Sequence, residues 1–386
     1  MNRKGRFMKK IARIIPINEV LRRKSVLLLG PRRTGKSFFL HHQVKPDRII
    51  NLLEADVFRK FSARPEFLRE LLTPKDKIVA IDEIQKLPSL MDEVHSLIES
   101  SDIKFILTGS SARKLNKTHT SLMAGRAKRM YLHPLVSAEI ENFDLIKILK
   151  YGSLPIVFNS TDPWDELKDY SGLYLKEEIQ AEALVRKIEN FSRFLEFAAI
   201  SNGQLLNYES IAQDAQVPAR TIREYYALLQ DTLMGYIINP IKSTSKRKCI
   251  STGKFYFFDI GVLNSIVDRE SVSSKTKEFG YLFEHFIFLE LRAYIDYFSP
   301  TSRLEFWRID EDAEVDFVIN HDIAIEVKST EFVQEKHLKG LKKFSSTEKT
   351  KKQIIVSLDK EKRRIGDITV YPYKEFLKAL WKGTFF

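Results

Sequence analysis

The stretch Gly30-Pro31-Arg32-Arg33-Thr34-Gly35-Lys36-Ser37 decides the fold of the first part of the chain. It follows an apolar run of strand length, Val26–Leu29, and leads into a helical pattern from Phe38 onward. Glycines at this spacing let backbone N–H groups wrap a phosphate chain, and the positive end of the next helix points at it. An ordinary glycine-rich turn is the alternative, but the flanking strand and helix favour a phosphate-binding loop.

The loop pattern gives a role to each of its polar residues. Lys36 is expected to pair with β- and γ-phosphate oxygens, and Ser37 is expected to ligate Mg²⁺. The other predicted nucleotide contacts in the loop are Gly30, Arg33, Thr34 and Gly35. A GTP-binding protein would need an Asn-Lys-x-Asp base reader, and the nearest match, Asn116-Lys117-Thr118-His119, lacks the acid. ATP with Mg²⁺ is therefore the predicted cofactor.

A further apolar strand, Ile78–Ile81, ends in two carboxylates, Asp82 and Glu83. After a phosphate-binding loop, this layout predicts that Asp82 holds Mg²⁺ and that Glu83 orients a water for attack on the γ-phosphate. Acidic residues at a strand end are also common as solvated caps. The separation from the loop favours the catalytic interpretation, which predicts a hydrolase and more than a nucleotide binder.

Two more groups are candidates for contact with the γ-phosphate. The strand Phe105–Leu107 is followed by Thr108 and Ser110, whose hydroxyls could sense the phosphate, although simple turn chemistry is the alternative. Arg126, after Gly125, could place a guanidinium on the transferring phosphoryl group, either within the chain or from a neighbouring subunit. An ordinary surface arginine is the alternative at that position.

Hydrophobic periodicity divides the chain into three predicted domains. From Val26 to about Leu135, short apolar strands alternate with amphipathic helices, which is typical of an α/β domain with a mainly parallel sheet. From about Pro163 to Ile241 the spacing of apolar residues is helical. After Gly280, a helix and four strands make a second α/β pattern. The predicted boundaries are 1–160, 161–265 and 266–386.

The middle domain and the charge of the chain point to nucleic acid. Tyr208–Leu229 has the spacing of two helices joined by a turn, which suits a helix-turn-helix with a wing formed by the basic stretch Lys242–Lys254. The chain has 63 Lys+Arg against 51 Asp+Glu, a net charge of +12, and a second basic stretch at Lys336–Arg364. These features predict DNA as a partner. The alternatives are a winged helix used for protein contact and basic stretches that are solvated faces.

Two predicted strands of the last domain carry a candidate metal site. Asp316 lies on the first strand, and Glu326 and Lys328 lie two positions apart at the end of the second, so they share a face. With Glu284 from the preceding helix, these carboxylates could bind Mg²⁺ or Mn²⁺, while Lys328 activates a water for phosphodiester cleavage. The alternative is a hairpin whose charges form solvated pairs or a salt bridge.

The sequence resembles a family of prokaryotic AAA-type ATPases with a C-terminal module long catalogued as a domain of unknown function. The motifs that carry the resemblance are Gly30–Ser37, Ala80–Gln85, Leu107–Ser111, Ala124–Ala127 with His133–Leu135, Gly280–Glu284 and Glu314–Phe317. The resemblance implies ATP and Mg²⁺ at Lys36, Ser37, Asp82 and Glu83, and it strengthens the case for Arg126. The last domain also resembles the PD-(D/E)XK nuclease-like fold, with Val315 where that pattern often has proline.

These expectations combine into one fold class, α/β. An AAA-like P-loop domain with a parallel sheet is expected in residues 1–160, a helical winged-helix module in 161–265 and a restriction-endonuclease-like α/β domain in 266–386. The expected function is an ATP-hydrolysing, DNA-binding protein, with Mg²⁺-dependent DNA cleavage in the last domain left open. The alternative is a nucleotide-controlled switch that recruits a protein partner, with an inert C-terminal site.

Cysteine content and the length of the apolar runs indicate the expected cellular location of the protein. The single cysteine, Cys249, excludes an internal disulfide framework, and no apolar run has the length of a signal peptide core or a membrane span. The predicted location is therefore the cytoplasm, with no membrane partner. A homo-oligomer is left open, because nothing in these residues fixes a subunit count.

Overall fold

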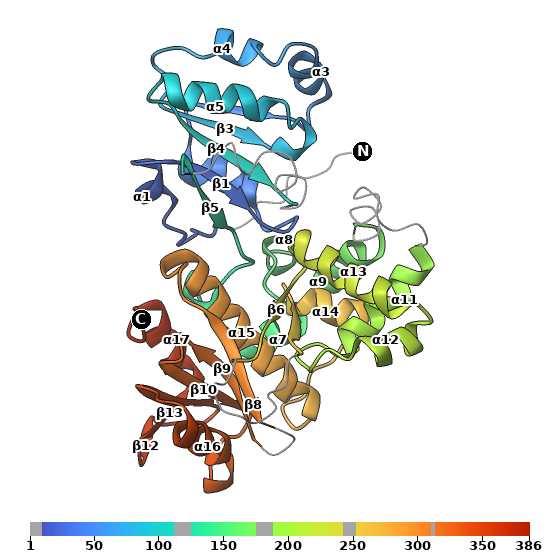
Figure 1. The fold of residues 1–386 in the computed structure, drawn as a ribbon, viewed down its shortest axis with the longest axis vertical. Helices are drawn as coiled ribbons and strands as arrows, with labels where there is room; N and C mark the ends of the chain where they lie inside the picture. The colour runs from blue at the N-terminus through green and yellow to red at the C-terminus, as the bar shows by residue number, and fades with distance from the viewer. Residues whose placement is uncertain (1–9, 112–124, 175–187, 242–251, 310–312) are drawn as a thin grey trace. The chain divides into compact units, whose positions relative to one another are not determined.

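The computed structural model describes residues 10–111, 125–174, 188–241, 252–309 and 313–386. The chain divides into two compact units, the first of residues 1–135 with 231–234 and the second of residues 136–230 with 235–386. Each unit is described by itself below, and Figure 1 labels many of the elements. The three-domain division at residues 160 and 265 stays a prediction.

The first unit is built on a five-stranded sheet in the order β2-β3-β4-β1-β5, in which every pairing is parallel. Its strands are β1 (Ser25–Leu29), β2 (Arg48–Asn51), β3 (Ile78–Asp82), β4 (Lys104–Gly109) and β5 (Ala127–Tyr131). Every residue of β1 is buried, as expected for an inner strand of a parallel sheet. Because the strands run the same way, the loops that follow them gather along one edge of the sheet, formed by the carboxyl ends of the strands. Open α/β sheets bind ligands there.

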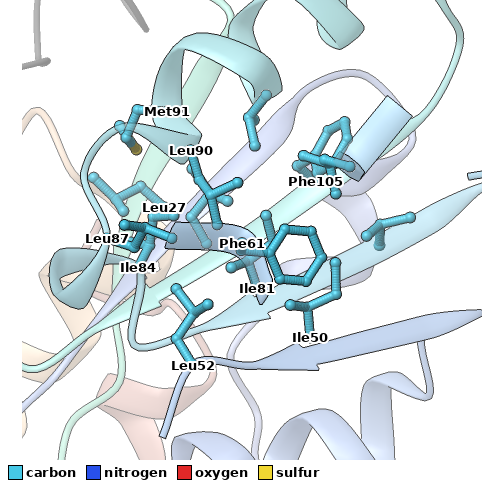
Figure 2. Packing of buried hydrophobic residues seen from close by; sticks show 14 of the residues in the cluster. Leu27, Ile50, Leu52, Phe61, Ile81, Ile84, Leu87, Leu90, Met91 and Phe105 are labelled. Carbon is cyan, nitrogen blue, oxygen red and sulfur yellow. The ribbon is translucent and has the colours of Figure 1, made fainter. Parts of the chain in front are cut away.

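One hydrophobic core holds the strands of this sheet in register. The helical elements of the unit are α1 (Ile17–Leu21), α2 (Lys36–Phe39), the π-helical turn η1 (Leu40–Val44), α3 (Ala55–Ala63), α4 (Phe67–Leu71), η2 (Ile84–Lys86) and α5 (Leu90–Ser100). Leu90 and Met91 of α5 are buried and pack with Phe61 of α3 and Phe105 of β4 (Figure 2). The amphipathic helices expected from the sequence thus cover the predicted strands.

The second unit begins with helices. Their bounds are η3 (Ser137–Glu139), α7 (Leu145–Tyr151), α8 (Pro155–Phe158), α9 (Pro163–Asp169), η4 (Tyr170–Tyr174), α11 (Ile188–Ile200), α12 (Tyr208–Ala215), α13 (Ala219–Asp231) and α14 (Ile260–Ile266). The two predicted helices of the helix-turn-helix are α12 and α13. Gln216 between them has a positive φ of 53°, and Asn207 caps α12 by accepting a hydrogen bond from the Ser210 N–H at 3.0 Å.

A two-stranded hairpin follows these helices. Strand β6 (Gly235–Ile238) pairs antiparallel with β7 (Lys254–Phe257), at the place expected for a wing. Residues 242–251, most of the predicted wing, lie outside the described residues. The winged-helix assignment therefore stays a prediction, while the two strands that would flank the wing are present.

The last part of the chain forms a six-stranded mixed sheet in the order β12-β13-β11-β10-β9-β8. Its elements are α15 (Lys277–Phe298), β8 (Leu304–Ile309), β9 (Ala313–Ile319), β10 (Ile323–Lys328), η5 (Glu335–Leu338), α16 (Lys339–Thr347), β11 (Lys352–Ser357), β12 (Arg363–Ile365), β13 (Ile368–Pro372) and α17 (Tyr373–Trp381). Strands β9 and β10 form an antiparallel hairpin, and β10 pairs parallel with β11. The predicted α/β class is confirmed. Among the described residues, no helix has the length and apolar character that a membrane crossing requires.

Candidate functional site

The phosphate-binding loop has the backbone geometry that its glycines predict. Gly35 has φ of 88° and Arg33 has φ of 62°, so the chain passes through the left-handed region before α2 begins. Gly30 is required for another reason, because a Cβ there would lie 2.5 Å from the Leu132 carbonyl oxygen. Inside the loop, the Thr34 hydroxyl donates to the Pro31 carbonyl at 2.8 Å.

Lys36 lies folded over this loop. Its side chain is buried, and its Nζ donates to the Gly30 carbonyl at 2.7 Å and to the Pro31 carbonyl at 3.1 Å. These carbonyls hold the ammonium at the mouth of the loop, where β- and γ-phosphate oxygens would be better acceptors because they carry charge. The predicted role of Lys36 fits this placement.

Ser37 and Asp82 are brought together from distant parts of the sequence. The Ser37 hydroxyl donates to Asp82 Oδ2 at 2.5 Å, which joins the start of α2 to the end of β3. The other oxygen of Asp82, Oδ1, accepts a short hydrogen bond from the Thr108 hydroxyl at the end of β4. A hydroxyl and a carboxylate in direct contact are a donor pair that fits one shared Mg²⁺ ion. Bound there, Mg²⁺ would neutralise negative charge on the phosphates.

Glu83 lies at the same edge in a strained backbone conformation. Its φ of 59° is in the left-handed region, which is uncommon for a residue other than glycine and is concentrated at functional sites. Its N–H donates to Thr108 Oγ1 at 3.1 Å, and its Oε2 accepts a short hydrogen bond from Gln85 Nε2. Ser110 lies beside them, 3.2 Å from Gln85 Nε2. Thr108 thus contacts both carboxylate residues, and Gln85 orients Glu83, a role that sequence reasoning missed.

Arg126 does not lie at this edge of the sheet. It immediately precedes β5, whose first residue, Ala127, pairs with Ser25 at the start of β1, whereas Tyr131 pairs with Leu29 beside the loop. The four residue steps from Ala127 to Tyr131 span roughly 13 Å of strand. The Arg126 guanidinium forms an ion pair with Glu99. A contact with nucleotide bound to the same chain does not suit this position, so only the role across a subunit boundary remains as a proposal.

A buried arginine supports the loop from behind. Arg13 donates from NH1 to the Thr34 carbonyl at 3.0 Å and from NH2 to the His133 carbonyl at 2.6 Å. Gln43 fixes the Arg13 backbone through bonds of 2.8 and 2.6 Å. Sequence reasoning missed Arg13, because no local pattern marks an arginine that binds backbone carbonyls distant in the sequence.

In the second unit, the predicted hairpin brings the C-terminal candidates together. Phe317 pairs with Ile325, which sets Asp316 beside Glu326 on the neighbouring strand, and Asp316 Oδ2 accepts from the Val327 N–H at 2.7 Å. The Lys328 ammonium lies 2.5 Å from Glu326 Oε1, as expected for residues two apart on one face. Asp316 and Glu326 are both buried.

Glu284 joins this group from α15, but a second lysine comes with it. Lys254, on β7, is only 4% exposed, and its Nζ lies 3.6 Å from Glu284 Oε1 and in closer contact with Glu314 Oε1. The Tyr256 hydroxyl donates to Glu284 Oε1 at 2.6 Å. Four carboxylates and two lysines therefore lie close together, three of them buried and three partly exposed: Glu284, Glu314, Asp316, Glu326, Lys254 and Lys328.

Burial affects the protonation of two carboxyl groups in this cluster, Glu284 and Glu326. It raises the pKa of Glu284, an effect that Lys254 opposes, and it raises the pKa of Glu326, with a further increase from the nearby Asp316. Among the residues that the structure describes, no three His, Cys, Asp or Glu side chains are arranged to hold a metal ion. With its carboxylates bonded to protein groups, the cluster in this arrangement does not fit the predicted divalent metal.

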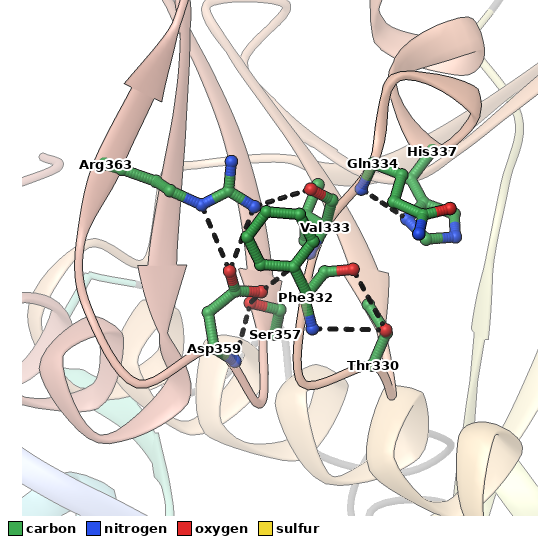
Figure 3. A network of polar contacts seen from close by, with 8 residues as sticks. All are labelled: Thr330, Phe332, Val333, Gln334, His337, Ser357, Asp359 and Arg363. Atoms are coloured by element: carbon green, nitrogen blue, oxygen red, sulfur yellow. Dashed lines mark hydrogen bonds and ion pairs between the residues drawn. The ribbon is translucent and has the colours of Figure 1, made fainter.

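A polar network fixes the segment that follows Lys328 (Figure 3). Asp359 Oδ2 accepts from the Ser357 hydroxyl at 2.8 Å and from the Val333 N–H at 3.0 Å. Arg363 donates from Nε to Asp359 Oδ1 at 3.1 Å and from NH2 to the Val333 carbonyl at 2.5 Å. The network ties the backbone after β10 to β11 and β12, so Lys328 leads into a fixed segment.

Protein-family models match three consecutive stretches of the chain. Residues 22–141 match the model of an AAA domain, residues 142–273 match a domain of unknown function (DUF8612), and residues 279–376 match another (DUF4143). Each match covers less than half of the chain. The AAA match contains the whole nucleotide site from Gly30 to Thr108.

Curated relatives extend over much of the chain at low identity. An uncharacterized protein of Haemophilus influenzae is 25% identical over 299 residues, covering 69% of this chain and 73% of its own length. Two proteins of Methanocaldococcus jannaschii, MJ1544 and MJ1637, both uncharacterized, are 23% and 22% identical. Their matches cover 70% and 92% of this chain, and 66% and 85% of their own lengths.

Solved structures show only a weak likeness. The Aeropyrum pernix Orc1 protein in complex with DNA matches with a TM-score of 0.29 and 9% identity, over 66% of this chain and 93% of that chain. Drosophila ORC bound to AT-rich DNA and Cdc6 matches with a TM-score of 0.22 and 9% identity, over 66% and 89%. TM-scores this low support no conclusion about the fold or function of this chain, so the assignment rests on the family match and the geometry of the site. Together these support an AAA P-loop ATPase domain at residues 22–141, followed by two domains of unknown function.

Proposed function

We propose that the chain hydrolyses ATP, with Lys36, Ser37 and Asp82 holding the Mg²⁺–nucleotide complex and Glu83 orienting the attacking water. The hydrogen bond of 2.5 Å between Ser37 and Asp82 carries this proposal. It places the hydroxyl that ends the loop motif against the carboxylate at the end of β3, which is the pairing that a shared Mg²⁺ requires.

The residues around Glu83 support a catalytic role for it. The Thr108 hydroxyl contacts both Asp82 and the Glu83 backbone. Loss of the γ-phosphate would therefore alter the hydrogen bonds of one hydroxyl at the end of β4. Gln85 holds the Glu83 carboxylate from the side. We assign Glu83 as the water-orienting base and Thr108 as the phosphate sensor.

DNA is the proposed partner, and charge supports it. The net charge of +12 favours a polyanion, and Lys336–Arg364 holds 11 Lys+Arg against 3 Asp+Glu. The test is ATP turnover by the full chain, with and without single-stranded and duplex DNA, using Lys36→Ala as the inactive control. Stimulation by DNA supports the proposal, whereas slow turnover that DNA does not change supports a nucleotide-controlled switch that recruits a protein.

A second activity, Mg²⁺-dependent phosphodiester cleavage, is a further candidate for the last domain. It is favoured by the placement of Asp316, Glu326 and Lys328 on adjacent strands. It is also favoured by Glu326 Oε2, which is buried and has no hydrogen-bond partner within the described part of the chain. Cleavage would require the Lys254 ammonium to leave Glu284. A gel assay with Mg²⁺ or Mn²⁺ on single-stranded, duplex and branched DNA tests it, and absence of cleavage by the parent chain removes it.

A further inference from the structure

Lys254 is a buried lysine that neither the family matches nor the sequence patterns assign to a site. It ends the basic stretch Lys242–Lys254 that was expected to form a wing, yet the residue is only 4% exposed, so it does not offer its charge to a DNA phosphate in this structure. Lysine is almost never fully buried unless it is paired. The burial of Lys254 therefore has to be explained by the groups that pair with its charge.

Strand geometry explains how the lysine reaches the carboxylates. Residues two apart on a strand share a face, so Lys254 and Tyr256 point the same way from β7 and both contact Glu284 Oε1, at 3.6 and 2.6 Å. The alternate residue Phe255 packs against the buried Tyr226, with ring centres 5.0 Å apart. The aromatic packing fixes β7, and β7 fixes the lysine.

The contacts of Lys254 join two matched domains. Lys254 and Tyr256 lie in the region that matches DUF8612, whereas Glu284 and Glu314 lie in the region that matches DUF4143. The Lys254 ammonium thus forms ion pairs with a carboxylate of α15, Glu284, and with a carboxylate of β9, Glu314. Arg308 gives Glu314 a second cation at 3.1 Å.

We propose that Lys254 is the resident cation of the carboxylate cluster, occupying the place beside Glu284 that a divalent metal ion would need. The cluster is then compensated by two lysines, Lys254 at Glu284 and Glu314 and Lys328 at Glu326. Asp316 is held by the Val327 N–H. The middle region of the chain keeps the nuclease-like site closed to metal by supplying this internal cation.

The consequence is a specific change in metal affinity. A divalent ion near Glu284 would be repelled by the Lys254 ammonium, and removing that charge removes the repulsion. In Lys254→Met, which keeps the length of the side chain, Mn²⁺ should bind at least about ten times more tightly than in the parent chain. Lys254→Arg keeps the charge and should exclude Mn²⁺ as the parent does.

The experiment is a Mn²⁺ titration of the full chain without nucleotide, followed by electron paramagnetic resonance of free Mn²⁺ and by the melting temperature. Binding in Lys254→Met should disappear when Asp316→Asn is added, which locates the metal at the cluster. Lys360→Met, an exposed lysine of the same unit, is the control for loss of one positive charge. Parent and Lys254→Met chains that bind Mn²⁺ equally at the cluster would overturn the proposal.

A second pair of variants covers the case in which Lys254→Met does not fold. Lys254→Met with Glu314→Gln removes one charge of each sign, so the net charge of the cluster is unchanged. Its Mn²⁺ affinity should exceed that of Glu314→Gln alone by a similar factor, and equal affinities contradict the proposal. ATP turnover plays no part in this readout, so the outcome is independent of the proposed ATPase function.

Discussion

At the scale of single residues, the nucleotide site separates binding from turnover. Lys36→Ala removes the ammonium that lies over the loop and should abolish ATP binding, because the charge on the β- and γ-phosphates loses its main partner. Glu83→Gln keeps the shape of the side chain and should bind ATP with turnover reduced about a hundredfold or more. Binding of a fluorescent ATP analogue and phosphate release measure the two effects. Parent-like turnover by Glu83→Gln would move the catalytic role to another group.

Thr108 offers a second test, because one hydroxyl serves two partners. Thr108→Val has the same shape but cannot donate to Asp82 or accept from the Glu83 N–H. We expect kcat to fall about tenfold, which corresponds to about 1.4 kcal/mol in the barrier. Thr108→Ser keeps the hydroxyl and is the matched control. The sensor assignment fails if the valine and serine variants turn over ATP at the same rate.

At the scale of elements, the long helix α15 carries a buried carboxylate outside the cluster. Glu290 accepts hydrogen bonds from the Ser137 N–H at 2.8 Å and from Trp381 Nε1 at 2.6 Å, which connects α15 to α17 and to the start of the second unit. Burial raises the pKa of Glu290 to about 7 from an ordinary value of 4.5. The carboxyl is therefore protonated in the folded protein over a pH range in which it is ionised in the unfolded chain.

This shift makes the stability of the second unit depend on pH. The contribution of Glu290 is fully present below about pH 4.5 and is lost as pH rises through about 7, because the folded state binds the proton more tightly. At most about 3.5 kcal/mol is involved, since the pKa rises from 4.5 to about 7 and one pKa unit corresponds to about 1.4 kcal/mol. Glu290→Gln should flatten the fall in unfolding free energy between pH 5 and 8. Glu278→Gln, an exposed change on the same helix, should not. Parallel pH profiles for parent and Glu290→Gln would rule out the effect.

At the scale of the whole molecule, the proposed DNA binding should depend steeply on salt. Each phosphate that a lysine or arginine neutralises releases condensed counterions, so affinity falls with salt in proportion to the number of contacts. Reversing the charge of Lys246, Arg247 and Lys248, which lie outside the described residues, should flatten this dependence if the predicted wing binds DNA. Fluorescence anisotropy at several salt concentrations measures the slope. An unchanged slope would place the DNA-binding surface elsewhere, with Lys336–Arg364 as the next stretch to test.

A subunit test belongs to the same scale. Arg126 lies at the start of β5, at the opposite ends of the strands from the phosphate-binding loop. It can therefore act on a nucleotide only from a neighbouring chain. Mixing Arg126→Ala with Lys36→Ala should then restore part of the ATP turnover that each variant lacks. A mixture as inactive as its two components would contradict the role of Arg126 across a subunit boundary.

Local sequence determined much of this protein. The loop motif, the apolar strands and the carboxylates after β3 identified a parallel α/β domain and predicted a nucleotide site in it, because glycine spacing and period-two or helical patterns are properties of neighbouring residues. The hairpin that sets Asp316 beside Glu326 was also readable, since a short turn fixes its register.

Tertiary structure alone decided how these parts are used. Lys254 ends the basic stretch that was expected to form a wing, but the packing of β7 buries it between Glu284 and Glu314, 30 and 60 positions further along the chain. Arg126 was a candidate for contact with the phosphates of its own or a neighbouring chain, but the parallel pairing of β5 with β1 places it at the opposite ends of the strands from the loop. Arg13 reaches Thr34 and His133 through backbone carbonyls, which no residue pattern encodes. Each outcome depends on contacts between residues distant in sequence, whose geometry is fixed only when the strands and helices pack together.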